Sequence, residues 1–140
     1  MNKEVILKWF LVLSGLSQMS YWGLSHIFFP RWYLNSVGMT ETANNPGSVL
    51  IFMNEIGVLT LGVGFATILA ARNPLKNLAI ILMLYIISLG SVGTSLYHIL
   101  CLHAATGEWT TIVIIGTQLI ILTALFPWNQ VRSTPKKVTY

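Results

Sequence analysis

The sequence is poor in charged residues, which make up 9% of 140 positions, against 54% hydrophobic residues. A soluble domain needs charge over most of its surface, so this composition is typical of a protein embedded in a lipid bilayer. The formal net charge is +4, but the basic residues stand in ones and twos along the chain. We therefore expect them to face anionic lipid headgroups, and we expect no nucleic-acid partner.

Cysteine is nearly absent as well, since Cys101 is the only one. A single thiol excludes an internal disulfide and any site built from several cysteines. The sequence also has no phosphate-binding loop, no nucleophile elbow and no dinucleotide-binding fingerprint. Without a nucleophile in a recognisable frame, we expect no catalysis by this chain alone.

Long apolar runs are what the sequence does contain. Four of them occupy residues 5–29, 49–71, 78–102 and 110–128. Each is close to or above the roughly 20 residues that a helix needs to cross about 30 Å of hydrocarbon. The connections at 72–77 and 103–109 are short, so sequential helices should be antiparallel neighbours. The sequence predicts an all-α protein with four transmembrane helices in an up-down-up-down bundle over residues 1–128, a loop at 30–47 and a short basic tail at 129–140.

The basic residues orient this predicted topology. Seven of the eight Lys and Arg residues fall on one side of it, and only Arg31 falls on the other. Cytoplasmic loops carry an excess of Lys and Arg, so we expect both termini and the tail in the cytoplasm and segment 30–47 outside. The expected location is the inner or plasma membrane, which the chain would cross several times.

Polar residues recur at helical spacing inside the apolar runs. One stripe lies in the first run and another in the third: Ser14, Gln18, Tyr21 and Ser25, then Ser88, Ser91, Ser95 and His98. Both stripes should face the bundle interior, where such residues most often serve helix packing. The second run has Gly62, Ala66 and Ala70 at steps of four, which predicts a close helix contact.

Glu55 is the unusual residue, because a carboxylate inside a bilayer costs a few kcal/mol unless it is protonated, paired or hydrated. Helix direction places Glu55, His98 and Gln118 within about two turns of the outer boundary, so we expect them to converge in a pocket in the outer half of the bundle. Further candidates for this pocket are Tyr21, His26 and Tyr97, with Arg31, His103 and Glu108 at its rim. Glu55 and a histidine would there exchange a proton or bind a quinone-like ligand. The alternative is that Glu55 is hydrogen-bonded and only sets helix register.

Two other occupants of the pocket have weaker support. A haem needs axial ligands at matched depth on facing helices, for which His26 and His98 are the available pair. A pair of histidines that binds no haem is common, so we do not expect a haem here. No His-x-x-His or Glu-x-x-His spacing supports a metal ion, and we expect none.

The second apolar run also resembles a known family. The segments Asn54-Glu55-Ile56-Gly57, Leu61-Gly62-Val63-Gly64 and Ala71-Arg72-Asn73-Pro74 are similar to the second helix of DoxX-like membrane proteins, which are small four-helix proteins. The resemblance covers residues 50–80 and reaches Glu55 and Gly62. Some members resemble subunits of quinone-reducing oxidoreductases. The resemblance implies a membrane subunit or a binder of a small quinone-like ligand. The alternative is a non-catalytic accessory or assembly subunit, with partner membrane subunits or in a homo-oligomer.

Overall fold

The computed structural model describes residues 2–36, 38–44, 47–102 and 107–128. The helical elements in chain order are α1 (Lys3–Ser17), the π-helix η1 (Gln18–Leu24), α2 (Ser25–Phe28), α3 (Pro30–Ser36), α4 (Thr40–Asn44), α5 (Val49–Ala71), α6 (Leu78–Leu102) and α7 (Gly107–Leu125). The all-α prediction is confirmed for this part of the chain. His103 and the predicted tail at 129–140 lie outside the described residues.

The first apolar run forms one helical segment in three parts. α1, η1 and α2 follow one another without a break, because the backbone stays in the right-handed helical region at residues 17–18 and 24–25. The segment ends at Phe28, one residue earlier than predicted. Phe29 leaves the helical region, with φ −133 and ψ 45, since the ring of Pro30 disfavours helical backbone at the residue before it.

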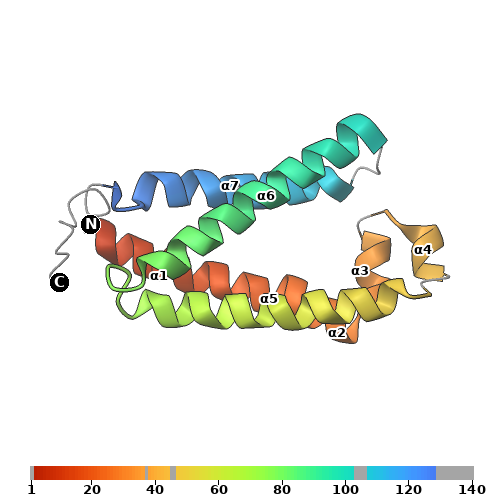
Figure 1. The fold of residues 1–140 in the computed structure, drawn as a ribbon, viewed down its shortest axis with the longest axis horizontal. Helices are drawn as coiled ribbons and strands as arrows, with labels where there is room; N and C mark the ends of the chain where they lie inside the picture. The colour runs from red at the N-terminus through yellow and green to blue at the C-terminus, as the bar shows by residue number, and fades with distance from the viewer. Residues whose placement is uncertain (1, 37, 45–46, 103–106, 129–140) are drawn as a thin grey trace, which may run out of the picture.

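The helices form two antiparallel pairs (Figure 1). The α1, η1 and α2 segment packs along α5, and α6 packs along α7. Both pairs meet at the end that holds the N-terminus and the α5–α6 turn, which we call the terminal end. The opposite end carries α3 and α4, and we call it the loop end. Figure 1 shows α6 running away from α5 toward the loop end, so the two pairs diverge there.

The shared core lies at the terminal end. It consists of buried side chains from all four apolar runs and the residue after α7: Leu7, Leu11, Ala71, Ile81, Leu84, Leu122 and Phe126. A smaller cluster at the loop end joins Leu34 of α3 to Met53 of α5, with Tyr33 packed against it. Between the diverging halves of the two pairs, the described residues form no buried apolar cluster of this kind.

Segment 30–47 is not the plain loop that the sequence suggested, because it contains α3 and α4. Pro30 suits the first position of α3, where its missing N–H is not needed. α3 ends in a turn at Gly38, whose φ of 84 favours glycine. Burial of Leu34 against Met53 fastens α3 to α5.

Four glycines let the two backbones of the first pair approach closely. A Cβ added to Gly64 would lie 2.8 Å from the backbone oxygen of Gly15, and one added to Gly57 would lie 2.9 Å from the backbone oxygen of Gly23. Real Cβ atoms do not come so near to backbone, so glycine is required on the contact face of α5. Gly57 and Gly64 are seven residues apart and therefore share that face.

The predicted contact through Gly62 does not form within the described chain. Gly62 is exposed, and a Cβ added there would meet nothing within 4 Å. Ala66 is half-buried and Ala70 is buried, so the residues of the predicted stripe become buried only toward the terminal end. The reason is rotational: α5 turns the face of Gly57 and Gly64 toward α1, and Gly62 lies on a different face.

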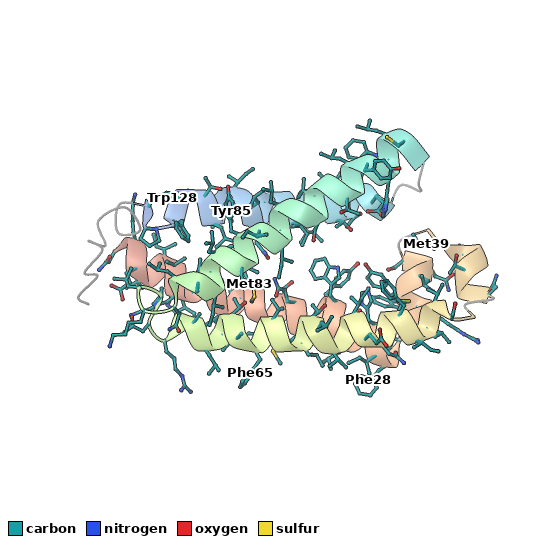
Figure 2. All side chains as sticks on the ribbon, viewed as in Figure 1. Phe28, Met39, Phe65, Met83, Tyr85 and Trp128 are labelled. Carbon is teal, nitrogen blue, oxygen red and sulfur yellow. The ribbon has the colours of Figure 1, made fainter. Side chains whose placement is uncertain are left out.

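Within the described residues, three helices are long and apolar enough to cross a membrane: α5, α6 over Leu78–Cys101, and α7 over Glu108–Leu125. Only 17%, 22% and 11% of the residues in their most apolar windows are buried within the chain. Phe28 and Phe65, for example, project away from the first pair (Figure 2). Apolar surface this extensive is unfavourable in water and favourable in lipid. The protein is a small multi-pass helical membrane protein that contacts the lipid bilayer.

Candidate functional site

A cleft separates the two helix pairs on the loop-end side of the shared core. Its deep part, of about 320 Å³, lies between η1, α5, α6 and α7. Its mouth, of about 450 Å³, lies nearer the loop end between α3, α6 and the first turn of α7. Ile56, Ile87, Ser91 and Thr111 line both parts, so the two are continuous. These volumes fall in the range of roughly 300–1,000 Å³ typical of small-molecule sites.

Glu108 brings the charge of a carboxylate to the mouth. It lies in the first turn of α7, where backbone N–H groups favour a negative charge. Ser95 Oγ donates a hydrogen bond to Glu108 Oε2 at 2.6 Å, and His98 Nδ1 lies 3.0 Å from Glu108 Oε1. The side chain of Glu108 is only 16% exposed. When neutral His98 donates its Nδ1–H to this carboxylate, its Nε2 becomes a hydrogen-bond and proton acceptor.

Gln118 lies three turns further along α7 and holds the second pair together. Its Nε2 donates to Ser88 Oγ of α6 at 2.8 Å, and Ser88 Oγ donates in turn to Leu84 O at 2.8 Å. Ser88 is buried. Hydrogen bonds of this kind between transmembrane helices contribute about 0.6–2 kcal/mol each. Gln118 therefore belongs to the α6–α7 contact.

Glu55 does not join the cleft. It is exposed on α5, on the face that also carries Gly62 and lies opposite the glycine contact with α1. Within the described residues no hydrogen bond links Glu55 to His98 or Gln118, and the expected convergence of the three does not form. The cause is the pairing of the helices. α6 turns its polar stripe toward α7, which brings Glu108 to His98, while α5 faces α1.

The polar stripes do face inward, as predicted. Ser14, Gln18, Ser25, Ser88 and Ser95 are all at most 6% exposed. Tyr97, the neighbour of His98 on α6, is 54% exposed and does not line the cleft.

His26 and Tyr21 belong to an aromatic cluster at the loop end of the first pair. The Nδ1 of His26 hydrogen-bonds to the backbone oxygen of Trp22 in its own helix. The ring of His26 lies 4.1 Å from that of Tyr33, and the Tyr21 ring lies 6.0 Å from the Tyr33 ring. His26 and His98 thus have different partners on different helix pairs. Among the described residues no group of three or more His, Cys, Asp or Glu is placed to hold a metal ion.

Tyr33 connects this aromatic cluster to the mouth of the cleft, which it also lines. Burial, reinforced by the nearby phenol of Tyr21, raises the pKa of Tyr33 to about 12. The Tyr33 phenol therefore keeps its proton at any physiological pH. It can act as a hydrogen-bond donor at the mouth but not as a base.

Gln18 is the first residue of the π-helix and lines the deep part of the cleft with Trp22. It is 6% exposed, and its Oε1 is buried without a hydrogen-bond partner in the described part of the protein. Leaving such a group unsatisfied costs about 1–3 kcal/mol. π-helical turns are rare and occur frequently at functional sites.

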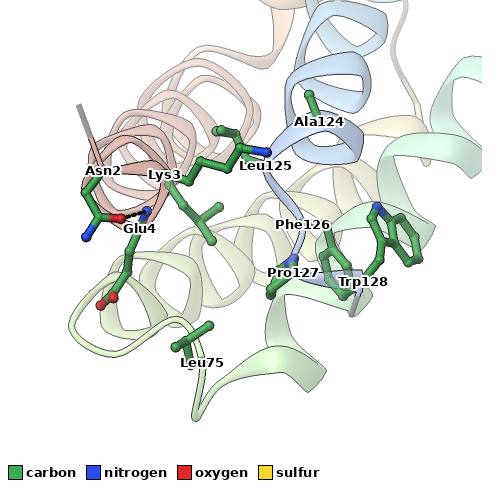
Figure 3. A pocket seen from close by; sticks show the side chains of 10 residues that line it. Asn2, Lys3, Glu4, Leu75, Ala124, Leu125, Phe126, Pro127 and Trp128 are labelled. Carbon is green, nitrogen blue, oxygen red and sulfur yellow. Dashed lines mark hydrogen bonds between the residues drawn. The ribbon is translucent and has the colours of Figure 1, made fainter. Parts of the chain in front are cut away.

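Another cavity lies at the terminal end (Figure 3). It measures about 460 Å³ and lies between the start of α1, Leu75 and the segment that follows α7. Two of its polar groups already have partners at the surface. Asn2 Oδ1 accepts the backbone N–H of Glu4 at 3.1 Å, and Glu4 forms an ion pair with Lys8 at 2.8 Å. This cavity therefore offers a weaker basis for a binding site than the cleft.

Two residues of the cleft were not singled out from the sequence. Glu108 was expected only at the rim, because the fourth helix was predicted to begin at residue 110 and α7 begins at Gly107. A usable signal exists, since Glu108, Thr111, Ile115 and Gln118 recur at steps of three, four and three. Gln18 was placed in the polar stripe of the first run, but no pattern distinguished it from its neighbours.

Comparison with known proteins adds a family. The sequence matches DUF6790, described as a family of unknown function, over residues 2–136. The chain belongs to this family. The match does not support the DoxX-like resemblance suggested by the segments around Glu55. No curated protein and no solved structure matches the DUF6790 chain significantly.

Proposed function

We propose that this DUF6790 protein binds a small, amphipathic, quinone-like ligand in the cleft between its two helix pairs. The observation that carries the proposal is the continuity of the cleft: its apolar deep part opens into a mouth that holds the His98–Glu108 pair. A mostly apolar pocket with a few convergent polar groups is the usual form of a small-molecule site.

The walls of the deep part suit a flat apolar body. Trp22, Ile87 and Ile115 come from three different helices, and their side chains provide dispersion contacts to a ring. At the mouth, His98 Nε2 accepts a hydrogen bond and the Tyr33 phenol donates one. A ligand dissolved in the bilayer would enter from the side, where the pairs diverge. The His98–Glu108 pair would then take up or return a proton of the ligand head.

The placement in the membrane forms part of the proposal. The helical segment at 3–28 is continuous, and its apolar residues Leu13, Leu16 and Leu24 are exposed like those of α5, α6 and α7. We infer that it is a fourth span and that the terminal end, with most of the basic residues, faces the cytoplasm. The cleft would then open in the outer half of the bilayer.

Filling the cleft tests this function. Ile87 lines both parts of the cleft, whereas Ile86 beside it is 60% exposed and lines neither. We expect Ile87→Trp to lower the affinity for a para-benzoquinone with a decyl tail at least tenfold, because the indole occupies the ligand volume. Ile86→Trp, the matched control, should bind as the wild type does. Equilibrium dialysis of the purified protein in detergent measures both affinities, and equal binding by the two variants would contradict the proposal.

A second candidate function is an accessory or assembly subunit. It is favoured by the exposed Glu55 carboxylate on the lipid-facing side of α5, next to the open surface at Gly62. A carboxylate in that position is stabilised when a second helix covers it and supplies a hydrogen-bond donor. In this case Gly62→Leu would dissociate a complex or homo-oligomer in mild detergent while the melting temperature of the monomer stays the same. Unchanged oligomer size would reject this alternative.

A further inference from the structure

Building on the proposed function, we infer that the ring of the ligand carries, besides the polar group at the mouth, a hydroxyl group in the deep part of the cleft that donates a hydrogen bond to Gln18 Oε1. The site would thus prefer the hydroxyl form of a ring ligand, such as a phenol or hydroquinone, over a form that has only acceptor oxygens. Gln18 lies in the deep part of the cleft, away from the His98–Glu108 pair at the mouth.

Gln18 Oε1 is a buried hydrogen-bond acceptor without a partner in the described chain. More than nine in ten buried polar groups in folded proteins have a hydrogen-bond partner. Among the described residues, Gln18 Oε1 is the buried side-chain atom that lacks one. Gln18 is 6% exposed and lines a cavity of about 320 Å³. Its Oε1 is closed off from that cavity, so a ligand donor reaches it once the side-chain amide turns toward the cavity.

No donor of the described chain forms a hydrogen bond with Gln18 Oε1. Thr60 lines the same part of the cleft, and its hydroxyl donates to the backbone oxygen of Ile56 at 2.7 Å. The amide of Gln118 donates to Ser88. Ser91 and Thr111 also line the deep part, and their hydroxyls form no hydrogen bond with Gln18 Oε1. A donor on a bound molecule would satisfy this oxygen.

The residues around Gln18 in the deep part agree with a neutral ligand group that donates a hydrogen bond. The residues that line the deep part include no charged side chain, so an ionic head would be desolvated there without compensation. At the mouth, the Nε2 of His98 is an acceptor and the Tyr33 phenol is a donor. The preference for a hydroxyl therefore belongs to the deep part, where Gln18 Oε1 is the acceptor without a partner.

Water is the competing occupant of the deep part. A buried water usually makes about three hydrogen bonds, and here it would have Gln18 with the hydroxyls of Ser91 and Thr111 as partners. A ligand hydroxyl that displaces this water would gain only if it restores the bond to Gln18. A pair of probes that differ in one donor separates the two cases.

The test uses a para-alkylphenol and its methyl ether, which share ring and tail but differ in the donated proton. We expect the wild-type protein to bind the phenol about tenfold more tightly than the ether, the ratio that one hydrogen bond of typical net strength provides. In Gln18→Met this preference should disappear, with both probes bound at the level of the ether. The melting temperature of Gln18→Met should stay equal or rise, because the variant removes an unsatisfied polar group.

Gln118→Met is the matched control, since it makes the same change at a glutamine that has a partner. It should lower the melting temperature and keep the phenol preference. Equal affinity of the wild type for phenol and ether would overturn the inference and leave the proposed function standing, provided the benzoquinone binds. A Gln18→Met protein that melts earlier and keeps the preference would assign Gln18 a structural role. If neither the phenol, the ether nor the benzoquinone binds, both the inference and the proposed function are contradicted.

Discussion

His98 and Glu108 illustrate how single residues are placed in this protein. A carboxylate within an apolar helix bundle is costly unless its oxygens are hydrogen-bonded, and here both are: one to His98 and the other to Ser95. The start of α7 adds the favourable end of the helix dipole. Glu55 has none of these partners and is exposed instead. At the residue scale, the two carboxylates therefore have different roles.

This difference predicts that the same conservative change has an effect at Glu108 and none at Glu55. Glu108→Gln removes the charge that receives the hydrogen bonds of Ser95 and His98, so we expect it to lower the free energy of unfolding by about 1–3 kcal/mol. It should also weaken ligand binding at the mouth, because the orientation of His98 is lost. Reversible unfolding in mixed micelles measures the first effect, and equilibrium dialysis of the benzoquinone measures the second.

Glu55→Gln is the control for that experiment. It changes the same functional group at an exposed position, so the unfolding free energy and the ligand affinity of the isolated protein should match those of the wild type. A larger effect at Glu55 than at Glu108 would show that the carboxylate roles are reversed.

At the scale of the elements, the two helix pairs are held together by different means. In lipid, apolar burial contributes little to helix association, so packing contacts and hydrogen bonds decide it. The first pair relies on close backbone approach at Gly15, Gly23, Gly57 and Gly64. The second pair relies on side-chain hydrogen bonds that join α6 to α7, from Gln118 to Ser88 and from Ser95 to Glu108.

Adding one methyl group tests the glycine contact. In Gly64→Ala the new Cβ would lie 2.6 Å from Met19 Cγ and 2.8 Å from the Gly15 backbone oxygen, so α5 must move away from α1. We expect a loss of about 1–3 kcal/mol in unfolding free energy. Gly62→Ala, where the Cβ meets nothing, should be neutral or slightly stabilising because alanine favours helix. Thermal unfolding in detergent compares the two, and equal melting temperatures would contradict the described contact.

The whole molecule is packed tightly at one end and open at the other. The core of Leu7, Ile81, Leu84 and Leu122 with their neighbours joins all four apolar runs at the terminal end. At the loop end the pairs diverge and α3 covers part of the space between them (Figure 1). In the proposed function, the packed end would hold the cleft open while a lipid-soluble ligand enters from the side.

The proposed membrane placement predicts which sites are accessible from each side. In a Cys101→Ser background, a cysteine at Thr40 should react with a membrane-impermeant maleimide added to intact cells. Cysteines at Lys3 and Lys76 should react only after the cells are permeabilised. The two lysines lie at the terminal end and Thr40 at the loop end, so labelling on opposite sides requires the first helical segment to cross the bilayer. Labelling of all three sites in intact cells would reject the four-span arrangement.

The sequence predicted which polar residues of the candidate site are buried, but not which residues they contact. Helical spacing placed Ser88, Ser95 and Gln18 on inward faces, and all three are buried. The same spacing did not reveal which helix each stripe faces, so His98 was expected to meet Glu55 and in fact meets Glu108. Periodicity describes one helix at a time, whereas a hydrogen bond between helices depends on their relative rotation.

The sequence by itself determined the properties that follow from composition and local pattern. Scarce charge and long apolar runs indicate a protein in a bilayer. In lipid, every backbone polar group of the apolar runs must be hydrogen-bonded within the segment, so these runs form helices. Pro30 ends the first segment, and the apolar lengths set the helices. Only the tertiary structure decided the pairing of α5 with α1 and of α6 with α7, the π-helix at Gln18, and the cleft between the pairs. These depend on contacts between residues far apart in the chain, where a glycine or a hydrogen bond acts only once its partner is in place.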